Sequence, residues 1–292
     1  MMSSRDKLGL MLGVIGVTIF AGSLPATRIA VATLDPWFLT AARAAIAGIA
    51  SVIVLVVLRR PLPPRDTWLP LVVIAFAIVL GFPIFSAIAM VTVPAAHGAV
   101  VIGILPLATS AAAVLLAGER PSTGFWMAGA AGTAIVVLFA FRHGAGGAMA
   151  VGDLVLLAAI GSAAVGYTLS GRLTRTMPGW EVISWACAIS LPVAAVATWA
   201  LWPANIAAVP NEAWGSLAFV GLFSQFIAFF AWNAGLAMGG IARVGQVQLL
   251  QPFISVALAS VVNNEAIETE TILFAAAVVA TVMIGRRMPI QR

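Results

Sequence analysis

Charged residues are scarce in this sequence. Only 9% of the 292 residues are Asp, Glu, Lys or Arg, whereas 62% are hydrophobic. A water-soluble domain carries roughly a quarter charged residues, so this chain has too little polar surface to cover a soluble globule. A soluble fold is therefore excluded, and the chain is expected to face the lipid bilayer.

Cysteine and histidine are nearly absent as well. The single Cys187 lies inside an apolar run, so no intrachain disulfide can form, and no cysteine cluster is available for a metal. Two histidines without grouped carboxylates offer no catalytic constellation. We therefore expect a protein that is not an enzyme and that uses neither cofactor nor metal. An intramembrane enzyme and a scaffold that transports nothing are the alternatives.

The net charge of +5 would suggest nucleic acid in a soluble protein. Here the basic residues stand between apolar runs, where they set the orientation of a membrane protein. The sequence therefore predicts no nucleic-acid partner and indicates no obligate protein partner.

Long apolar runs dominate what is present. A membrane-spanning helix needs about 20 mostly apolar residues, and this rule predicts an all-α membrane protein with ten transmembrane helices. The expected spans are 8–31, 36–58, 67–90, 93–116, 122–141, 151–173, 180–202, 212–237, 240–262 and 268–286.

The two halves of the chain repeat one another at a shift of 146 residues. The run from His97 to Glu119 has a second version from Arg243 to Glu265, and Pro106 corresponds to Pro252. A repeat this long and this apolar predicts two copies of one membrane-embedded unit. We place the first five-helix repeat at 1–145 and the second at 146–292.

Arginine and lysine predict the orientation. With the N-terminus in the cytoplasm, the outer segments carry only Arg28 and Arg142. The cytoplasmic segments carry Arg5, Lys7, Arg59, Arg60, Arg65, Arg120, Arg172, Arg175, Arg243, Arg286, Arg287 and Arg292. This positive-inside bias predicts that both termini are cytoplasmic. Since five helices per unit is an odd number, the second unit is inverted, an architecture typical of secondary transporters.

Prolines interrupt the fourth and ninth spans at matched positions, Pro106 and Pro252. Each removes a backbone hydrogen bond and frees a carbonyl four residues earlier. Such matched interruptions point to a site at the membrane midplane, although plain kinks are the alternative. Pro83 interrupts the third span, whereas its counterpart Phe229 does not, which predicts an interruption in one half only.

Polar residues recur inside the spans. Gln248, Gln251 and Ser255 share one helical face, and Gln225 begins a stripe with Phe229 and Trp232. Polar side chains inside spans usually face the interior of the bundle. They predict a polar and aromatic cavity, with helix-to-helix hydrogen bonding as the alternative.

Arg43 is the only full charge well inside a span. Seven residues after Pro36 place it about 10 Å along the helix. A buried guanidinium needs a partner, and we expect a structural anchor, paired with Asp35 or the end of a helix, rather than a solute ligand.

Carboxylates are missing from the middle of every span. Proton-coupled pumps generally need one there, so His97 is the only titratable candidate near neutral pH. A uniporter or exchanger fits better. Because basic residues do not cluster either, a neutral or zwitterionic solute with an apolar part matches the expected cavity.

Short motifs in this order resemble a known family. They are Phe20-Ala21-Gly22-Ser23, Ala26-Thr27-Arg28, Pro36 with Arg43, His97-Gly98-Ala99, Pro106, Gly118-Glu119, Gly152-Asp153-Leu154, Asn233-Ala234-Gly235-Leu236, Pro252 and Glu265. Across the whole chain they resemble the ten-helix EamA-type exporters of the drug/metabolite transporter superfamily. Within that family the chain looks most similar to the YddG amino-acid exporters of bacterial inner membranes.

The resemblance implies a 5+5 inverted-repeat bundle around a central cavity in the cell inner membrane. It also implies that the helix pairs three–four and eight–nine rock to export amino acids, including aromatic or apolar ones, and related metabolites. A carrier of the same fold for drugs, sugars or nucleotide sugars is the alternative. Glu119 and Glu265 are expected to stabilise the N-termini of the fifth and tenth helices.

We assign candidate roles from the helical stripes. His97, Tyr167, Asn233 and Gln248 are expected to contact the amino and carboxylate groups of the solute. Phe85, Trp185 and Trp232 are expected to pack on its side chain, and Pro83, Pro106 and Pro252 are the expected bending points.

Overall fold

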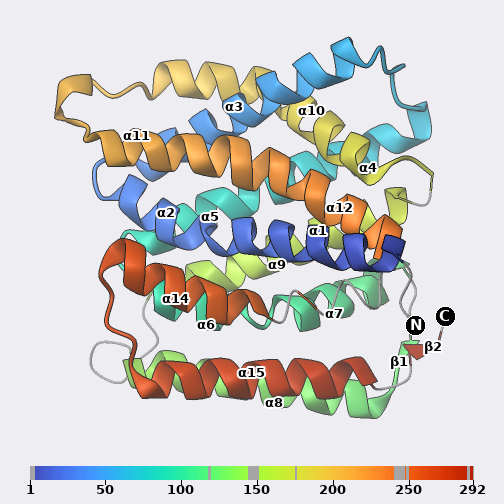
Figure 1. Ribbon diagram of the computed structural model, residues 1–292, viewed down its shortest axis with the longest axis vertical. Helices are drawn as coiled ribbons and strands as arrows, with labels where there is room; N and C mark the ends of the chain where they lie inside the picture. The colour runs from blue at the N-terminus through green and yellow to red at the C-terminus, as the bar shows by residue number, and fades with distance from the viewer. Residues whose placement is uncertain are drawn as a thin grey trace.

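The protein is a bundle of long helices that run along a common direction (Figure 1). The computed structural model describes residues 4–117, 120–143, 151–174, 176–239, 247, 250–287 and 290–291. Seven described helical stretches are long and apolar enough to cross a membrane, and three shorter apolar helices bring the total to ten. The ten expected helices are confirmed. Much of the first part of the ninth, residues 240–246, 248 and 249, lies outside the described residues.

The first half supplies five spans, several of them built from more than one segment. They are α1 (Ser4–Ala21) with α2 (Ser23–Val31); α3 (Pro36–Val57); η1 (Arg65–Thr67), α4 (Trp68–Ile74), η2 (Ala75–Gly81) and α5 (Phe82–Met90); α6 (Ala95–Ile102) with α7 (Leu105–Ala117); and, after the short strand β1 (Arg120–Pro121), α8 (Thr123–His143).

The second half supplies the other five. They are α9 (Val151–Leu173); α10 (Gly179–Ala200); after the short turn η4 (Ile206–Ala208), α11 (Asn211–Ala218), η5 (Phe219–Ile227) and α12 (Ala228–Gly239); α14 (Gln251–Asn263); and α15 (Thr269–Arg287), which the strand β2 (Ile290–Gln291) follows. Strand β2 pairs antiparallel with β1. The start of α1 and the end of α15 therefore lie at one end of the bundle, which we call the terminal end (Figure 1).

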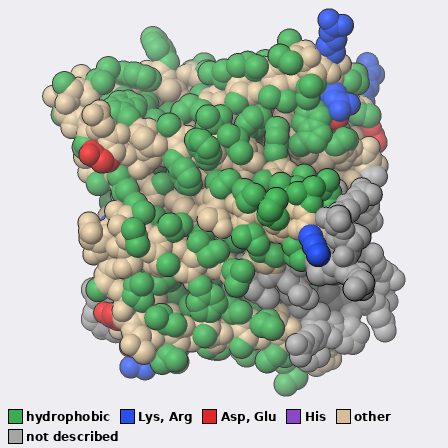
Figure 2. Space-filling model, in the orientation of Figure 1, with side chains coloured by type: hydrophobic (Ala, Val, Ile, Leu, Met, Phe, Trp, Pro, Cys, Tyr) green, Lys and Arg blue, Asp and Glu red, His purple; other side chains and the backbone are tan. Residues whose placement is uncertain are grey.

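The lateral surface is hydrophobic. Figure 2 shows one face whose middle is covered by hydrophobic side chains, with the charged side chains toward the two ends. Large apolar side chains on this surface are well exposed, among them Val56, Leu69, Val261 and Leu273. Exposed apolar area on this scale is unusual for a soluble protein and is what a lipid-facing surface requires.

Helices begin at matched positions in the two halves. The broken fourth span resumes at Leu105 as α7, and α14 begins at Gln251, 146 residues later, so that Pro106 and Pro252 are each the second residue of their helix. The third span of each half contains a π-helical segment, η2 at Ala75–Gly81 and η5 at Phe219–Ile227, which end 146 residues apart.

The second π-helical segment corrects a sequence-based expectation. We expected the third span to be interrupted in the first half only, because Phe229 stands where the first half has Pro83. Both spans are in fact interrupted at the matched position. A π-helix changes the hydrogen-bonding register of the backbone without requiring proline, so the sequence contains no obvious sign of the second one.

Contacts between the halves follow a two-fold pattern. The first span of one half packs on the third span of the other: α1 on α12, and α9 on α4, η2 and α5. Each remaining span contacts its own counterpart, as α3 does with α10, α6 with α14 and α8 with α15. This exchange is what two related units produce around a two-fold axis, and the odd number of spans per unit makes the repeat an inverted one.

Glu265 ties the halves together at the end of the bundle opposite the termini. The helix α14 ends with Asn264 in the left-handed conformation, at φ 55°, which turns the chain sharply. The carboxylate of Glu265 then accepts hydrogen bonds from the backbone amides of Ala95 and Ala96, both at 2.8 Å. It thus caps the first turn of α6 and complements the dipole of that helix.

This contact corrects the role we expected for Glu265. The sequence placed it near the start of the tenth helix, whereas the carboxylate reaches the start of the fourth span. The reason is tertiary, since α14 packs beside α6 and the turn after α14 lies over its first residues. Glu119, for which we expected the matching role, lies outside the described residues.

We predict that Glu265→Ala destabilises the protein by about 1–2 kcal/mol, because two amides of α6 lose their charged acceptor. The midpoint of thermal unfolding, followed by tryptophan fluorescence in detergent, should fall by about 2–4 °C for each kcal/mol lost. Glu265→Gln keeps one acceptor oxygen and should lose less. An unchanged midpoint for the alanine variant would show that the contact does not hold α6.

Candidate functional site: a central cavity between the halves

The candidate site is a cavity at the junction of the two halves. Both repeats contribute to its wall, and the broken or π-helical parts of the third, fourth, eighth and ninth spans all reach it. The lining residues are Phe20, Ser23, Leu24, Arg43, Ile78, Phe82, Ala99, Ile102, Gly103, Leu105, Tyr167, Ser224, Gln225, Phe229, Gln251, Pro252, Ser255 and Val279.

The cavity is narrow in this conformation. It encloses about 60 Å³, room for a few water molecules but well below the roughly 300–1,000 Å³ of pockets that hold small-molecule ligands. The described helices must therefore separate before a solute can enter.

Aromatic rings form one wall. The rings of Phe20 and Phe229 meet edge to face with their centroids 4.9 Å apart, and the ring of Tyr167 lies 6.4 Å from that of Phe229. Phe82 adds a third phenylalanine. Such rings offer an apolar surface with an electrostatically positive edge, which suits the hydrophobic part of a solute.

The serine hydroxyls of the cavity bond to the protein itself. Ser23 Oγ lies 2.5 Å from Ser224 Oγ, which joins α2 to η5. Ser255 Oγ donates to the carbonyl of Ala21 at 2.9 Å, which joins α14 to the end of α1. These hydroxyls hold the helices together, so their hydrogen-bonding capacity is largely used before any solute arrives.

Two other polar side chains are buried without a partner. Arg43 is only 3% exposed and Gln225 only 2%. Neither Nε of Arg43 nor Nε2 of Gln225 has a hydrogen-bond acceptor. Buried donors are nearly always paired, because leaving one unpaired costs about 1–3 kcal/mol and more when it is charged. The cavity thus presents two hydrogen-bond donors that the described protein does not satisfy.

Arg43 does not have the partner that we expected. Asp35 Oδ1 instead accepts from the amides of Trp37 and Phe38, at 2.8 and 3.1 Å, and so caps the start of α3. No salt bridge within the described residues involves Arg43. The expectation of an anchor paired with Asp35 is therefore wrong.

Backbone groups also line the cavity where the helices break. Ile102, Gly103 and Leu105 surround the gap between α6 and α7. At η2, Ser162 Oγ donates to the carbonyl of Ala77 at 2.9 Å. A Cβ atom at Gly166 would lie 2.3 Å from Cγ1 of Ile78, so only glycine lets α9 approach η2 this closely.

The comparisons with known proteins agree with this geometry. Residues 7–141 and again 150–285 match the EamA-like transporter family. The chain belongs to the EamA-like transporter family. It is 45% identical to the uncharacterized transporter YdeK of Bacillus subtilis (strain 168), over 97% of this chain and 99% of that one. A solved crystal structure shares the fold, with a TM-score of 0.64 at 20% identity over 96% of each chain.

Membership in the EamA-like family establishes a membrane transporter rather than an enzyme. Each of the two matches covers one five-span half, in agreement with the repeat seen in the helix breaks. The relatives leave the solute open, and the finer resemblance to amino-acid exporters is taken up below.

Only some of the residues predicted from the sequence line the cavity of this EamA-like transporter. Tyr167 and Pro252 do so. Gln248 lies outside the described residues. Pro106 is described in the backbone of α7 but its side chain is not, and Pro83 is buried in the first turn of α5, directly after η2. Each of the helices α5, α7 and α14 thus begins one residue before its proline, whereas bending there stays a prediction.

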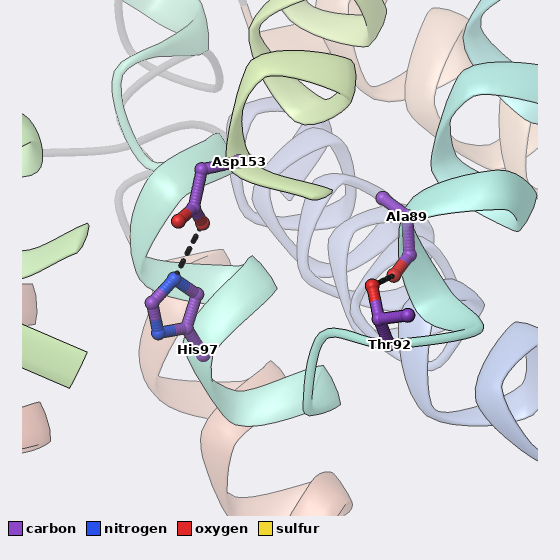
Figure 3. A network of polar contacts seen from close by, with 4 residues as sticks. All are labelled: Ala89, Thr92, His97 and Asp153. Carbon is purple, nitrogen blue, oxygen red and sulfur yellow. Dashed lines mark hydrogen bonds and ion pairs between the residues drawn. The ribbon is translucent and has the colours of Figure 1, made fainter. Parts of the chain in front are cut away.

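His97 lies away from the cavity wall. Figure 3 shows its ring on α6 pointing toward Asp153 on α9, with Nε2 and Oδ1 2.7 Å apart. Asp153 is 1% exposed, and the ring of His97 also lies 4.7 Å from that of Phe139. The pair links the two halves near the end of the bundle opposite the termini.

The other candidates pack between helices. A Cβ atom at Gly16 would lie 3.0 Å from Cβ of Trp232, and one at Gly179 would lie 2.9 Å from Cγ of Asn233. Trp232 therefore faces α1, and Asn233 faces the start of α10. Trp185 packs beside the apolar core between α3 and α10, and Phe85 is half-buried on α5.

The π-helix explains why the eighth span does not form the continuous stripe that we expected. Gln225, Phe229 and Trp232 share a face only if the helix keeps 3.6 residues per turn. The segment η5 has a wider turn and ends at Ile227, which rotates the later residues relative to the earlier ones. Gln225 and Phe229 reach the cavity and Trp232 does not. The sequence identified Arg43 and Gln225 as polar residues inside spans, but it could not show that they lack partners.

Metal ligands do not gather within the described ranges. No group of three or more His, Cys, Asp or Glu side chains occurs there, and no acidic side chain is among those found to line the cavity.

Since Arg43 is a buried charge without a partner, we predict that Arg43→Met raises the free energy of unfolding by on the order of 1–3 kcal/mol. Arg28→Met is the matched control, because Arg28 donates to the carbonyls of Met90 and Val91 at the end of α5, and its loss should lower stability. Thermal unfolding of both variants in detergent measures this contrast. A lower midpoint for Arg43→Met would show that Arg43 stabilises the fold, as the expected structural anchor would.

Proposed function

We propose that this transporter exports amino acids, including aromatic and apolar ones, and related metabolites by alternating access through the central cavity. The observation that carries the proposal is the mixed lining of that cavity, where three phenylalanines face one guanidinium and the amides of Gln225 and Gln251. A solute with both an apolar side chain and charged or polar groups matches such a wall.

Alternating access requires helices that can bend on either side of the site. The helix starts at Pro106 and Pro252 and the two π-helical segments lie at matched positions in the two halves. Backbone groups in π-turns and at helix ends can change hydrogen-bond partner at low cost. These matched breaks support the rocking of the third and fourth spans against the eighth and ninth.

The cavity supports a partly revised set of solute contacts. Tyr167 is retained, and Arg43, Gln225 and Gln251 join it as polar contacts, with Phe20, Phe82 and Phe229 as the apolar wall. Gln248 is retained because its repeat equivalent, Ile102, lines the cavity. His97, Asn233, Phe85, Trp185 and Trp232 stay predictions for a wider conformation.

We predict that purified protein in liposomes preloaded with unlabelled L-phenylalanine accumulates labelled L-phenylalanine by counterflow. Phe229→Ala should reduce the initial rate by roughly 10-fold, because an aromatic contact is worth about 1–1.5 kcal/mol. Phe76→Ala is the matched control, since it removes an exposed ring of η2 that is not among the residues found to line the cavity, and it should leave most of the rate.

A panel of labelled solutes in the same assay separates the amino-acid carrier from its alternative. Counterflow of a drug, a sugar or a nucleotide sugar, with none of any amino acid, would contradict the proposal. A carrier of nucleotide sugars would also need to compensate two phosphates, whereas Arg43 is the one cation among the described lining residues.

We further propose that the protein resides in the cell inner membrane, with the terminal end of the bundle in the cytoplasm and the repeats divided at residues 145 and 146. The positive-inside bias supports this orientation. At the terminal end, Arg60 lies 3.3 Å from Glu181 and 5.0 Å from the ring of Trp180.

We predict that Asn205→Cys, at the end opposite the termini, reacts with a membrane-impermeant maleimide on intact cells. Thr174→Cys, at the terminal end, should react only after permeabilisation. Both positions are exposed, and the buried native Cys187 should remain unlabelled. The reverse pattern would place the termini outside and overturn the assigned direction of export.

A further inference from the structure

We propose that the central cavity is a carboxylate site, in which Arg43 and Gln225 are the donors and a carboxylate is the group that a solute must carry. This inference rests on the proposed function and narrows it, since it makes the carboxylate the determinant of recognition and the amino group dispensable.

Two buried donors in the cavity have no hydrogen-bond acceptor. Nε of Arg43 and Nε2 of Gln225 are both buried and both unpaired, and both side chains line the same space. The amide of Gln225 can present either its nitrogen or its oxygen, but a guanidinium is a donor only. The missing partner of Arg43 must therefore be an acceptor.

Within the described residues, the charge of Arg43 has no salt-bridge partner. A cation buried at membrane depth is costly unless an opposite charge or several acceptors meet it. The described carboxylates that form salt bridges, Glu181, Asp153 and Glu270, bind Arg60, His97 and Arg142 instead, and Asp35 caps α3. The counter-charge has to come with the solute.

The serine hydroxyls of the cavity are already paired within the protein. Ser23, Ser224 and Ser255 already bond to one another or to the backbone, so they do not call for a ligand. No acidic side chain is found in the lining to pair with an ammonium group. A single guanidinium beside three phenylalanines suits a carboxylate on an apolar group, because the fork of arginine matches the two oxygens of a carboxylate.

The two repeats differ at the positions of the two donors, so a bound solute has one orientation in the cavity. The repeat equivalent of Arg43 is Ile189, and that of Gln225 is Val79. The helices follow two-fold symmetry, whereas the two donors do not, and the segments that carry them, α3 and η5, pack on one another. A carboxylate bound there leaves the apolar part of the solute to Phe20, Phe82 and Phe229.

The test uses two analogues of phenylalanine. 3-Phenylpropanoate keeps the carboxylate and lacks the amino group, whereas phenethylamine keeps the amino group and lacks the carboxylate. Each is added to the purified full chain in detergent, and binding is measured as the shift of the thermal midpoint against concentration. We expect 3-phenylpropanoate to bind and to compete with labelled L-phenylalanine in counterflow. We expect phenethylamine to do neither.

Variants then assign the carboxylate to its donors. Arg43→Gln should weaken binding of 3-phenylpropanoate on the order of 10- to 100-fold, the usual loss for a charged hydrogen bond, and Gln225→Leu should weaken it less. Arg43→Lys keeps the charge but not the fork, so it should recover part of the affinity. Arg65→Gln removes an exposed arginine and should change nothing.

The outcomes separate this inference from the proposed function. If phenethylamine binds as tightly as 3-phenylpropanoate, or if folded Arg43→Gln binds 3-phenylpropanoate like the parent, the carboxylate site is overturned while amino-acid counterflow still supports the carrier. If L-phenylalanine, the other amino acids of the panel and both probes all fail to bind and to move, the proposed function fails with it.

Discussion

The fold depends on the need of every backbone polar group for a partner when no water is present. Hydrocarbon cannot satisfy a free carbonyl or amide, so irregular backbone is tolerated only where protein or a polar cavity surrounds it. In this chain the irregular parts, η2, η5 and the starts of α7 and α14, all lie around one small cavity. The same constraint that keeps the outer helices regular therefore accounts for the position of the candidate site.

The two repeats share the arrangement of their helices but differ in the polar side chains at the centre. Helices α7 and α14 begin 146 residues apart, and the contacts between spans exchange as two-fold symmetry requires. The side chains at the centre do not follow that symmetry, since Arg43, Ser224 and Gln225 face apolar equivalents in the other repeat. The arrangement of the helices is therefore symmetric, whereas the polar side chains of the candidate site are not.

Polar contacts between the halves gather near the ends of the bundle. Glu265 caps α6, His97 pairs with Asp153, and Arg60 pairs with Glu181. Charged groups are less costly near the membrane surface than at its centre, so the ends can hold strong pairs. The middle of the bundle has weaker contacts, such as that between Ser23 and Ser224. It also contains Arg43, whose Nε has no hydrogen-bond partner.

The sequence by itself determined the ten spans, the repeat and the matched prolines, because hydrophobic length and proline act locally along a chain. Only the tertiary structure decided which polar side chains meet. Glu265 reaches α6 rather than the tenth helix because α14 packs beside α6, and η5 turns Gln225 into the cavity and Trp232 out of it. Arg43 changed from an expected anchor to a free donor because Asp35 is used at the start of α3. Partners of buried groups come from other helices, and their identity depends on packing that no local pattern encodes.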